Sequence, residues 1–142
     1  MTGQPAVHAT TVAYHAPEGW RAVMILGASG AGKSDLALRL IGRGWRLVSD
    51  DYTTVWSSGG RLFGSAPERI AGRIEARGVG ITSAPTVRLA RIVLAAACVA
   101  EAEERLPEPQ FRRFAGVDLP LLAIDPRPAS AVEKVAAAIR RL

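Results

Sequence analysis

The stretch GASGAGKS at residues 27–34 follows the apolar run AVMIL and precedes the run LALRLI. Its spacing is that of the phosphate-binding P-loop, G-x-x-x-x-G-K-[ST], whose glycines let backbone N–H groups converge on an anion. The lysine charge neutralises the β- and γ-phosphates of a nucleotide, and the serine hydroxyl is the usual Mg²⁺ ligand. The residues predicted to hold the phosphates are Gly27, Ala28, Ser29, Gly30, Ala31, Gly32, Lys33 and Ser34. A P-loop joins a strand to a helix, so this stretch also predicts an α/β domain.

The flanking residues have the periodicities that a P-loop needs. WRAVMIL at residues 20–26 is a short apolar run typical of a strand, and residues 34–44 read as a helix that ends at two glycines. Further strands are predicted at residues 6–14, 46–50, 52–56 and 61–64, with a hairpin turn at residues 58–60. Residues 72–82 and 87–100 look extended, and a short helical turn is expected after Pro67. Strands therefore outnumber helices, which favours a strand-rich mixed sheet over the parallel sheet of an ordinary P-loop nucleoside triphosphatase.

The C-terminal end is predicted to be a helix over about residues 131–141. Ser130 and Glu133 have the spacing of a capping box. The apolar stripe of this helix consists of Val132, Val135, Ala136 and Ile139.

Length and composition indicate one domain over residues 1–142, with 49% apolar and 22% charged residues. The net charge of +5 does not predict a nucleic-acid binder, because the arginines are scattered and no aromatics are interleaved with them. There is no apolar run long enough to span a bilayer and no signal-peptide pattern, so a cytoplasmic protein without membrane contact is expected. Cys98, the single cysteine, lies in an apolar run and is expected to be a packing residue rather than a nucleophile.

Asp50 and Asp51 end the apolar run RLVSD, 17 and 18 residues after Lys33. An isolated acidic pair is more often a surface turn. Directly after a P-loop helix, however, a carboxylate has two uses: to hold Mg²⁺ through water or to accept a proton from the attacking nucleophile. The pair is therefore a candidate for the catalytic carboxylates, and the sequence does not separate the two roles.

At this point the chain resembles a known family, HPr kinase/phosphorylase. The run GASGAGKSDLALRLIGRGWRLVSDDYTTV at residues 27–55 has the P-loop, helix, Gly-bounded turn and Asp-Asp pair of that family in the same order. The family motif Glu-x-Arg-Gly-x-Gly-Ile matches residues 75–81, and the family's catalytic His and Arg match His8 and Arg105. The resemblance covers most of residues 6–105 and implies an HPr kinase / PEP carboxykinase-like fold.

The resemblance also implies a set of roles. Lys33 and Ser34 would hold the phosphates of ATP and the Mg²⁺, and Glu75 would be a second Mg²⁺ ligand. One of Asp50 and Asp51, with Asp51 slightly favoured, would take the proton from an acceptor serine.

His8 would poise the proton-accepting carboxylate, and Arg105 would stabilise phosphoryl charge. The partner would be an HPr-type phosphocarrier protein of the phosphotransferase system, and the assembly a homo-oligomer, commonly a hexamer in that family. Taken without the resemblance, His8 reads as a structural or surface histidine and Arg105 as part of a solvated charged face.

Three departures from the family pattern bear on function. Many members are over twice as long and carry an N-terminal domain, so regulation by such a domain is not expected here. Ala28 replaces an Asp that many relatives have in the P-loop, which leaves the balance of kinase and phosphorylase activities open. The usual C-terminal GRN segment is not recognisable, so the surface that grips the partner is expected to differ. Two alternatives to the kinase remain: an ATP-binding sensor without phosphotransfer, and a kinase of small metabolites.

Overall fold

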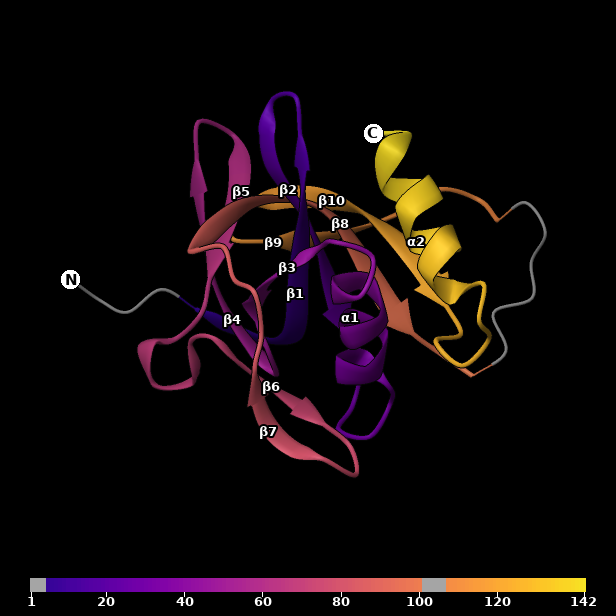
Figure 1. Cartoon of the computed structure of the whole chain (residues 1–142). Helices are drawn as coiled ribbons and strands as arrows, with labels where there is room; N and C mark the ends of the chain where they lie inside the picture. The colour runs from indigo at the N-terminus through magenta and orange to yellow at the C-terminus, as the bar shows by residue number, and fades with distance from the viewer. Residues whose placement is uncertain (1–4, 101–106) are drawn as a thin grey trace.

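The computed structural model describes residues 5–100 and 107–142 (Figure 1). Ten strands and two α-helices lie in these ranges, together with one 3₁₀ turn. The strands are β1 Ala6–Ala16, β2 Gly19–Leu26, β3 Arg46–Ser49, β4 Tyr52–Ser58, β5 Arg61–Ser65, β6 Arg73–Ala76, β7 Gly80–Ser83, β8 Leu89–Cys98, β9 Gln110–Phe114 and β10 Val117–Ile124. The helices are α1 Lys33–Ile41, η1 Glu68–Ile70 and α2 Ala131–Arg140.

Eight of the strands form one mixed sheet in the order β2-β1-β4-β5-β8-β10-β9, with β3 paired to β1. The P-loop strand β2 is antiparallel to β1 and parallel to β8. Because β8 also pairs with β5, the pairings β2-β1-β4-β5-β8 return to β2 and close a ring of five strands. Strands β6 and β7 form a separate hairpin. The predicted strand-rich mixed α/β fold is confirmed.

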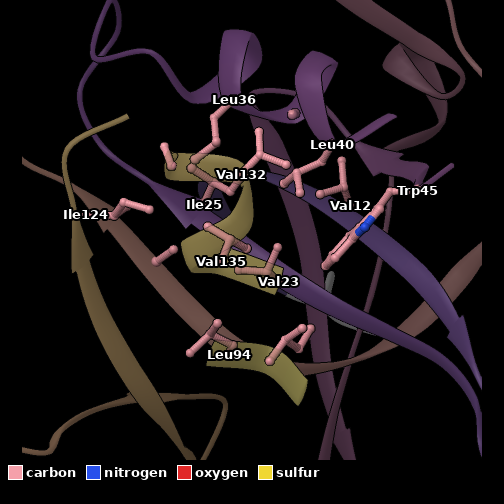
Figure 2. Close-up of a cluster of buried hydrophobic side chains, with 14 of the residues drawn as sticks. Val12, Val23, Ile25, Leu36, Leu40, Trp45, Leu94, Ile124, Val132 and Val135 are labelled. Atoms are coloured by element: carbon pink, nitrogen blue, oxygen red, sulfur yellow. The ribbon is translucent and has the colours of Figure 1, made fainter. Parts of the chain in front are cut away.

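Both α-helices cover the same outer face of the sheet, and their apolar faces form the first core cluster (Figure 2). Leu36 and Leu40 of α1 and Val135 of α2 are fully buried there, against Val23 and Ile25 of β2. The apolar residues spaced by four in α1 and the apolar stripe of α2 are therefore buried against the sheet, as predicted. This packing fixes the start of α1, and with it the P-loop, against the sheet.

A second core cluster contains strand residues only and fills the space within the ring. Its members are small or medium in size, among them Ala9, Met24 and Ile92. Gly64 of β5 faces this space, and a Cβ atom there would lie 2.6 Å from Ile92 Cδ1. Small side chains at such positions let the strands close upon one another.

The predicted strands before residue 100, the turn at residues 58–60 and the helical turn after Pro67 are all present. Residues 72–82 form the β6–β7 hairpin, and residues 89–98 of the second extended stretch form β8. The sequence reading missed β9 and β10. In the described part of the chain no helix is long and apolar enough to cross a membrane.

The predicted capping box is wrong, although the helix it was meant to begin is present. Ser130 is the N-cap of α2 but has helical dihedrals (φ −71°, ψ −6°), and its side chain makes no capping hydrogen bond. Glu133 does not reach back to it, because its carboxylate binds Arg43 at 2.7 Å. A Ser-x-x-Glu spacing forms a box only when the N-cap backbone is extended.

Candidate active site

The P-loop connects the end of β2 to the start of α1. Gly32, the N-cap of α1, has φ 104°, which lies in the left-handed region, and a Cβ atom there would meet the Pro126 ring at 3.0 Å. Both constraints require glycine. No side chain caps this helix, so its first N–H groups stay available to an anion.

Lys33 carries a buried charge without an opposite charge beside it. Its side chain is only 5% exposed, and its Nζ donates a hydrogen bond to the Ala28 carbonyl oxygen at 3.1 Å. Within residues 5–100 and 107–142 no carboxylate forms an ion pair with Lys33. A buried cation of this kind is stabilised by an incoming anion, and a phosphate group fits the loop that surrounds it.

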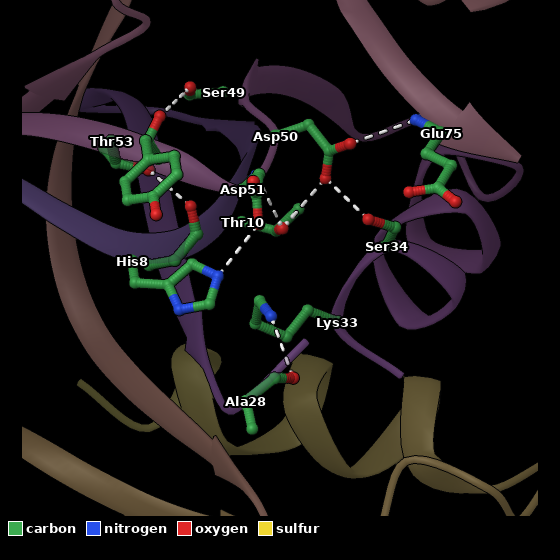
Figure 3. Close-up of polar contacts among 12 residues, drawn as sticks. His8, Thr10, Ala28, Lys33, Ser34, Ser49, Asp50, Asp51, Thr53 and Glu75 are labelled. Atoms are coloured by element: carbon green, nitrogen blue, oxygen red, sulfur yellow. Dashed lines mark hydrogen bonds and ion pairs between the residues drawn. The ribbon is translucent and has the colours of Figure 1, made fainter. Parts of the chain in front are cut away.

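Asp50 lies at the centre of the hydrogen-bond network in Figure 3. Its Oδ1 atom accepts hydrogen bonds from the Ser34 hydroxyl at 2.6 Å and the Thr10 hydroxyl at 2.9 Å. Its Oδ2 atom accepts one from the Glu75 backbone N–H at 3.0 Å. This buried carboxylate thereby ties together the P-loop helix, strand β1 and the β6–β7 hairpin.

Asp51 has a different environment. Its φ of 67° is positive, and the Tyr52 N–H donates to the Asp50 carbonyl oxygen at 2.7 Å, as in a γ-turn. The Asp51 N–H donates to the Thr10 hydroxyl at 3.1 Å, which steadies this strained backbone. The Asp51 side chain is 55% exposed, and its Oδ1 contacts His8 Nε2 at 2.9 Å (Figure 3). The His8 ring in turn stacks on Tyr52.

These groups border a pocket of about 660 Å³. Among the residues predicted for the site, those that line it are Ser29, Gly30, Gly32, Lys33, Ser34, Asp50, Asp51 and Glu75. His8 reaches the pocket through its contact with Asp51. Gly27, Ala28 and Ala31 belong to the loop but do not line the pocket, and Arg105 lies outside the described residues.

Sequence reasoning missed four residues of this site. Thr10 binds Asp50 and the Asp51 backbone, and it follows His8 by two positions on β1. Alternation along a strand puts two such residues on one face, and this signal could have indicated Thr10. Arg69, Arg73 and Arg77 line the pocket beside Glu75. Their charges suit a polyphosphate, but only Arg77 lay within a recognised motif.

The donor set fits Mg²⁺. Ser34, Asp50 and Glu75 offer the hard oxygen ligands that this ion prefers. The described residues contain no group of three or more His, Cys, Asp or Glu side chains that could hold a metal. Mg²⁺ does not need such a cage, because it usually keeps several waters and binds one or two protein groups plus substrate phosphates.

Cys98 lies next to the P-loop but is not part of its chemistry. Burial raises the pKa of the Cys98 thiol to about 11, although the nearby Lys33 and Arg39 charges act in the opposite direction. A thiol with so high a pKa is protonated at neutral pH and is a poor nucleophile. This supports the packing role expected from the sequence.

The chain is similar to known proteins in both sequence and fold. The sequence profile of the HPr Serine kinase C-terminal domain matches residues 7–99. An HPr kinase/phosphorylase from Brevibacillus brevis is 52% identical over 66 residues, which is 46% of this chain and 21% of that protein. An HPr kinase/phosphorylase from Caldanaerobacter subterraneus subsp. tengcongensis is 40% identical over 119 residues, covering 75% of this chain and 39% of that protein.

Among solved structures, the Hpr(Ser) kinase/phosphatase from Coxiella burnetii superposes with a TM-score of 0.81 at 24% identity. The match covers 97% of this chain and 95% of that chain, and at this identity it establishes the fold. The chain spans about a fifth to two fifths of the two HPr kinase/phosphorylases named above. The matched profile takes in β1, the P-loop, the aspartate pair and the β6–β7 hairpin, and the chain belongs to the HPr Serine kinase C-terminal domain family.

Proposed function

We propose that the chain is an ATP- and Mg²⁺-dependent protein serine kinase whose acceptor is an HPr-type phosphocarrier protein. The observation that carries this proposal is the convergence of a P-loop and an exposed carboxylate, Asp51, on one pocket. A protein that only binds nucleotide would need the P-loop but not the exposed carboxylate beside it. The names of the two HPr kinase/phosphorylases compared above support a phosphocarrier as acceptor.

Phosphate binding is assigned to the P-loop. The Lys33 ammonium and the open N–H groups at the start of α1 would hold the β- and γ-phosphates. Ser34 and Glu75 would hold Mg²⁺, which neutralises charge on the phosphates when bound. The Ser34 hydroxyl donates its hydrogen to Asp50 Oδ1, and this bond would orient the lone pairs of the Ser34 oxygen toward that ion.

Proton transfer is assigned to Asp51 rather than Asp50. Both Asp50 oxygens already accept hydrogen bonds, and the side chain is buried. Asp51 is exposed to the pocket, and its only described side-chain partner is His8, which would fix its orientation. Asp51 would accept the proton of the acceptor serine as that oxygen attacks the γ-phosphorus and the bond to ADP breaks.

The direct test is to incubate the chain with ATP, Mg²⁺ and an HPr-type carrier and to analyse the carrier by mass spectrometry. We expect one phosphoryl group on a serine, and none when EDTA replaces Mg²⁺. ATP binding without a modified carrier would identify a nucleotide sensor instead. Transfer to a small hydroxylated metabolite but not to the carrier would identify a metabolite kinase.

The reverse, phosphate-driven reaction uses the same atoms. Microscopic reversibility makes the protonated Asp51 the acid that returns its proton to the serine oxygen while phosphate takes the phosphoryl group. Ala28 stands where many relatives have Asp, so the P-loop lacks a negative charge next to Lys33, and this eases the binding of phosphate and pyrophosphate. Pyrophosphate released from phosphoserine-carrier and millimolar phosphate would establish a phosphorylase. Its absence beside robust kinase activity would make the chain a one-way kinase.

A further inference from the structure

A second pocket lies at the opposite end of β2 from the P-loop. It has a volume of about 300 Å³, at the lower end of the range for small-molecule sites. Arg21, which lines it, precedes Gly27 by six residues, or about 20 Å along an extended strand. Figure 1 shows the tips of the β1–β2 and β4–β5 hairpins together at the top of the view, with the β6–β7 hairpin of the P-loop pocket at the bottom.

Three guanidinium groups converge on this second pocket from three strands that are distant in sequence. Arg21 of β2 is the cross-strand partner of Arg91 of β8, and Arg91 is the partner of Phe63 of β5. Cross-strand partners share one face of the sheet, so these side chains form a row. Arg61 lies two positions before Phe63 and faces the same side.

The positive charge of the second pocket is only partly balanced by the described residues. Glu18 is the only acid that lines it, and Arg21 donates to Glu18 at 3.3 Å and to the Leu142 oxygen at 3.2 Å. Arg61 and Arg91 form no hydrogen bond or ion pair within residues 5–100 and 107–142. The Arg21 Nε atom is buried and also has no hydrogen-bond partner there.

The pKa of Arg91 is shifted in the direction expected for a cation that lies close to other cations. Burial lowers the pKa of Arg91, and the nearby Arg61 and Arg21 charges lower it further. Three like charges are held close together by the register of the strands, so a bound anion would relieve their repulsion.

The apolar part of the second pocket is formed by Phe63, Leu89 and Ala90. Trp56 is the cross-strand partner of Phe63 and stacks on it at 6.2 Å between ring centroids, so both rings stand on the face of the arginine row. Trp20, which precedes Arg21 on β2, faces the other side of the sheet and packs against the second core cluster. Arginine forks match the oxygens of a phosphate, while flat apolar walls suit the organic part of a ligand.

We infer that this second pocket, with its row of Arg21, Arg61 and Arg91, binds a small molecule that carries a phosphate group. The phosphate contacts the guanidinium groups, and the organic part of the ligand packs against the rings of Phe63 and Trp56. The site does not share residues with the P-loop pocket and stands whether or not the chain transfers phosphate.

The test uses phenyl phosphate, which combines one phosphate with one ring, and follows the Trp56 indole N–H by NMR. The titration is done in a Lys33→Ala background, so that the P-loop does not contribute. We expect saturable shifts of the Trp56 signal, with affinity at least about tenfold weaker after Arg61→Ala or Arg91→Ala. Arg112→Ala removes an exposed arginine from β9, outside the pocket, and is expected to leave the affinity unchanged.

Arg61 is exposed, so Arg61→Ala keeps the test valid if Arg91→Ala does not fold. Three results would overturn the inference. The first is no shift of Trp56 at about 10 mM ligand, a concentration that fills even a weak millimolar site. The second is equal binding by both pocket variants and the control, and the third is equally tight binding of benzoate. Shifts seen in the chain that retains Lys33 but absent from the Lys33→Ala background would assign the phosphate to the P-loop.

Discussion

Asp50 and Asp51 are chemically identical side chains at adjacent positions, and the γ-turn between them separates their environments. Asp50 is 8% exposed and accepts three hydrogen bonds, whereas Asp51 opens to the pocket and contacts His8. Because both Asp50 oxygens already bind donors and the side chain is buried, Asp50 is poorly placed to meet the hydroxyl of an acceptor. The same bonds make it a good anchor for Ser34.

Asp51→Asn is therefore expected to keep nucleotide binding and to slow phosphotransfer by about a hundredfold or more, the usual scale for loss of a general base. Single-turnover transfer from ATP to the carrier measures this rate. Asp118→Asn is the matched control, since Asp118 pairs with Arg113 outside the pocket. Wild-type transfer by Asp51→Asn would remove Asp51 from the proton-transfer step.

Thr10 is the residue on which both aspartates depend. Thr10→Val keeps the shape of the side chain but takes one donor from the buried Asp50 carboxylate and one acceptor from the Asp51 N–H. We expect the free energy of unfolding in urea to fall by about 1–3 kcal/mol. Thr54→Val on neighbouring β4, where the side chain makes no hydrogen bond in the described structure, is the control and is expected to be near neutral. Equal losses in the two variants would show that the Thr10 bonds contribute nothing.

The P-loop and the aspartate pair could be predicted from sequence because their chemistry depends on local spacing. Thr10 and the pocket arginines could not, because they are brought in by strand pairing between distant segments. Thr10 and Asp50 are 40 positions apart, and the register of β1 with β3 and β4 brings them together. The γ-turn at Asp51 could not be predicted either, because the residue with the positive φ is not a glycine.

At the scale of elements, periodic helices and alternating strands were predictable, while β9 and β10 were not. Gln110–Phe114 is almost wholly exposed, so it has no alternation of buried and exposed residues to read. Val117–Ile124 contains a proline, a residue that is rare inside strands. In the structure β10 pairs with β8 on one side and β9 on the other, so both strands owe their form to the sheet.

The start of α2 gives a test at this scale. A working N-cap contributes about 1 kcal/mol, but the Ser130 side chain makes no capping bond. Ser130→Ala is therefore expected to change the free energy of unfolding by no more than about 0.5 kcal/mol. Ile139→Ala, in the fully buried stripe of α2, should cost about 2–5 kcal/mol and shows that the assay detects losses in this helix. A Ser130→Ala loss near 1 kcal/mol would mean that the cap forms in solution.

In the whole molecule, the closed ring of strands carries a pocket at each end. The P-loop pocket lies where β2 ends, and the arginine-lined second pocket lies where β2 begins. Helices α1 and α2 brace the P-loop end from outside, with Pro126 against Gly32. The shape of the P-loop pocket thus depends on long-range packing as much as on the P-loop motif itself.

The central claim is that the P-loop pocket holds a nucleoside triphosphate through the buried Lys33 charge. The most direct measurement is a calorimetric titration of the intact chain with ATP and Mg²⁺. Lys33→Ala should abolish measurable binding while circular dichroism shows an unchanged fold, because phosphate contacts of a charged group are lost. Lys134→Ala removes the chain's other lysine, exposed on α2, and should bind ATP like the wild type. Unaltered ATP affinity in Lys33→Ala would contradict the claim.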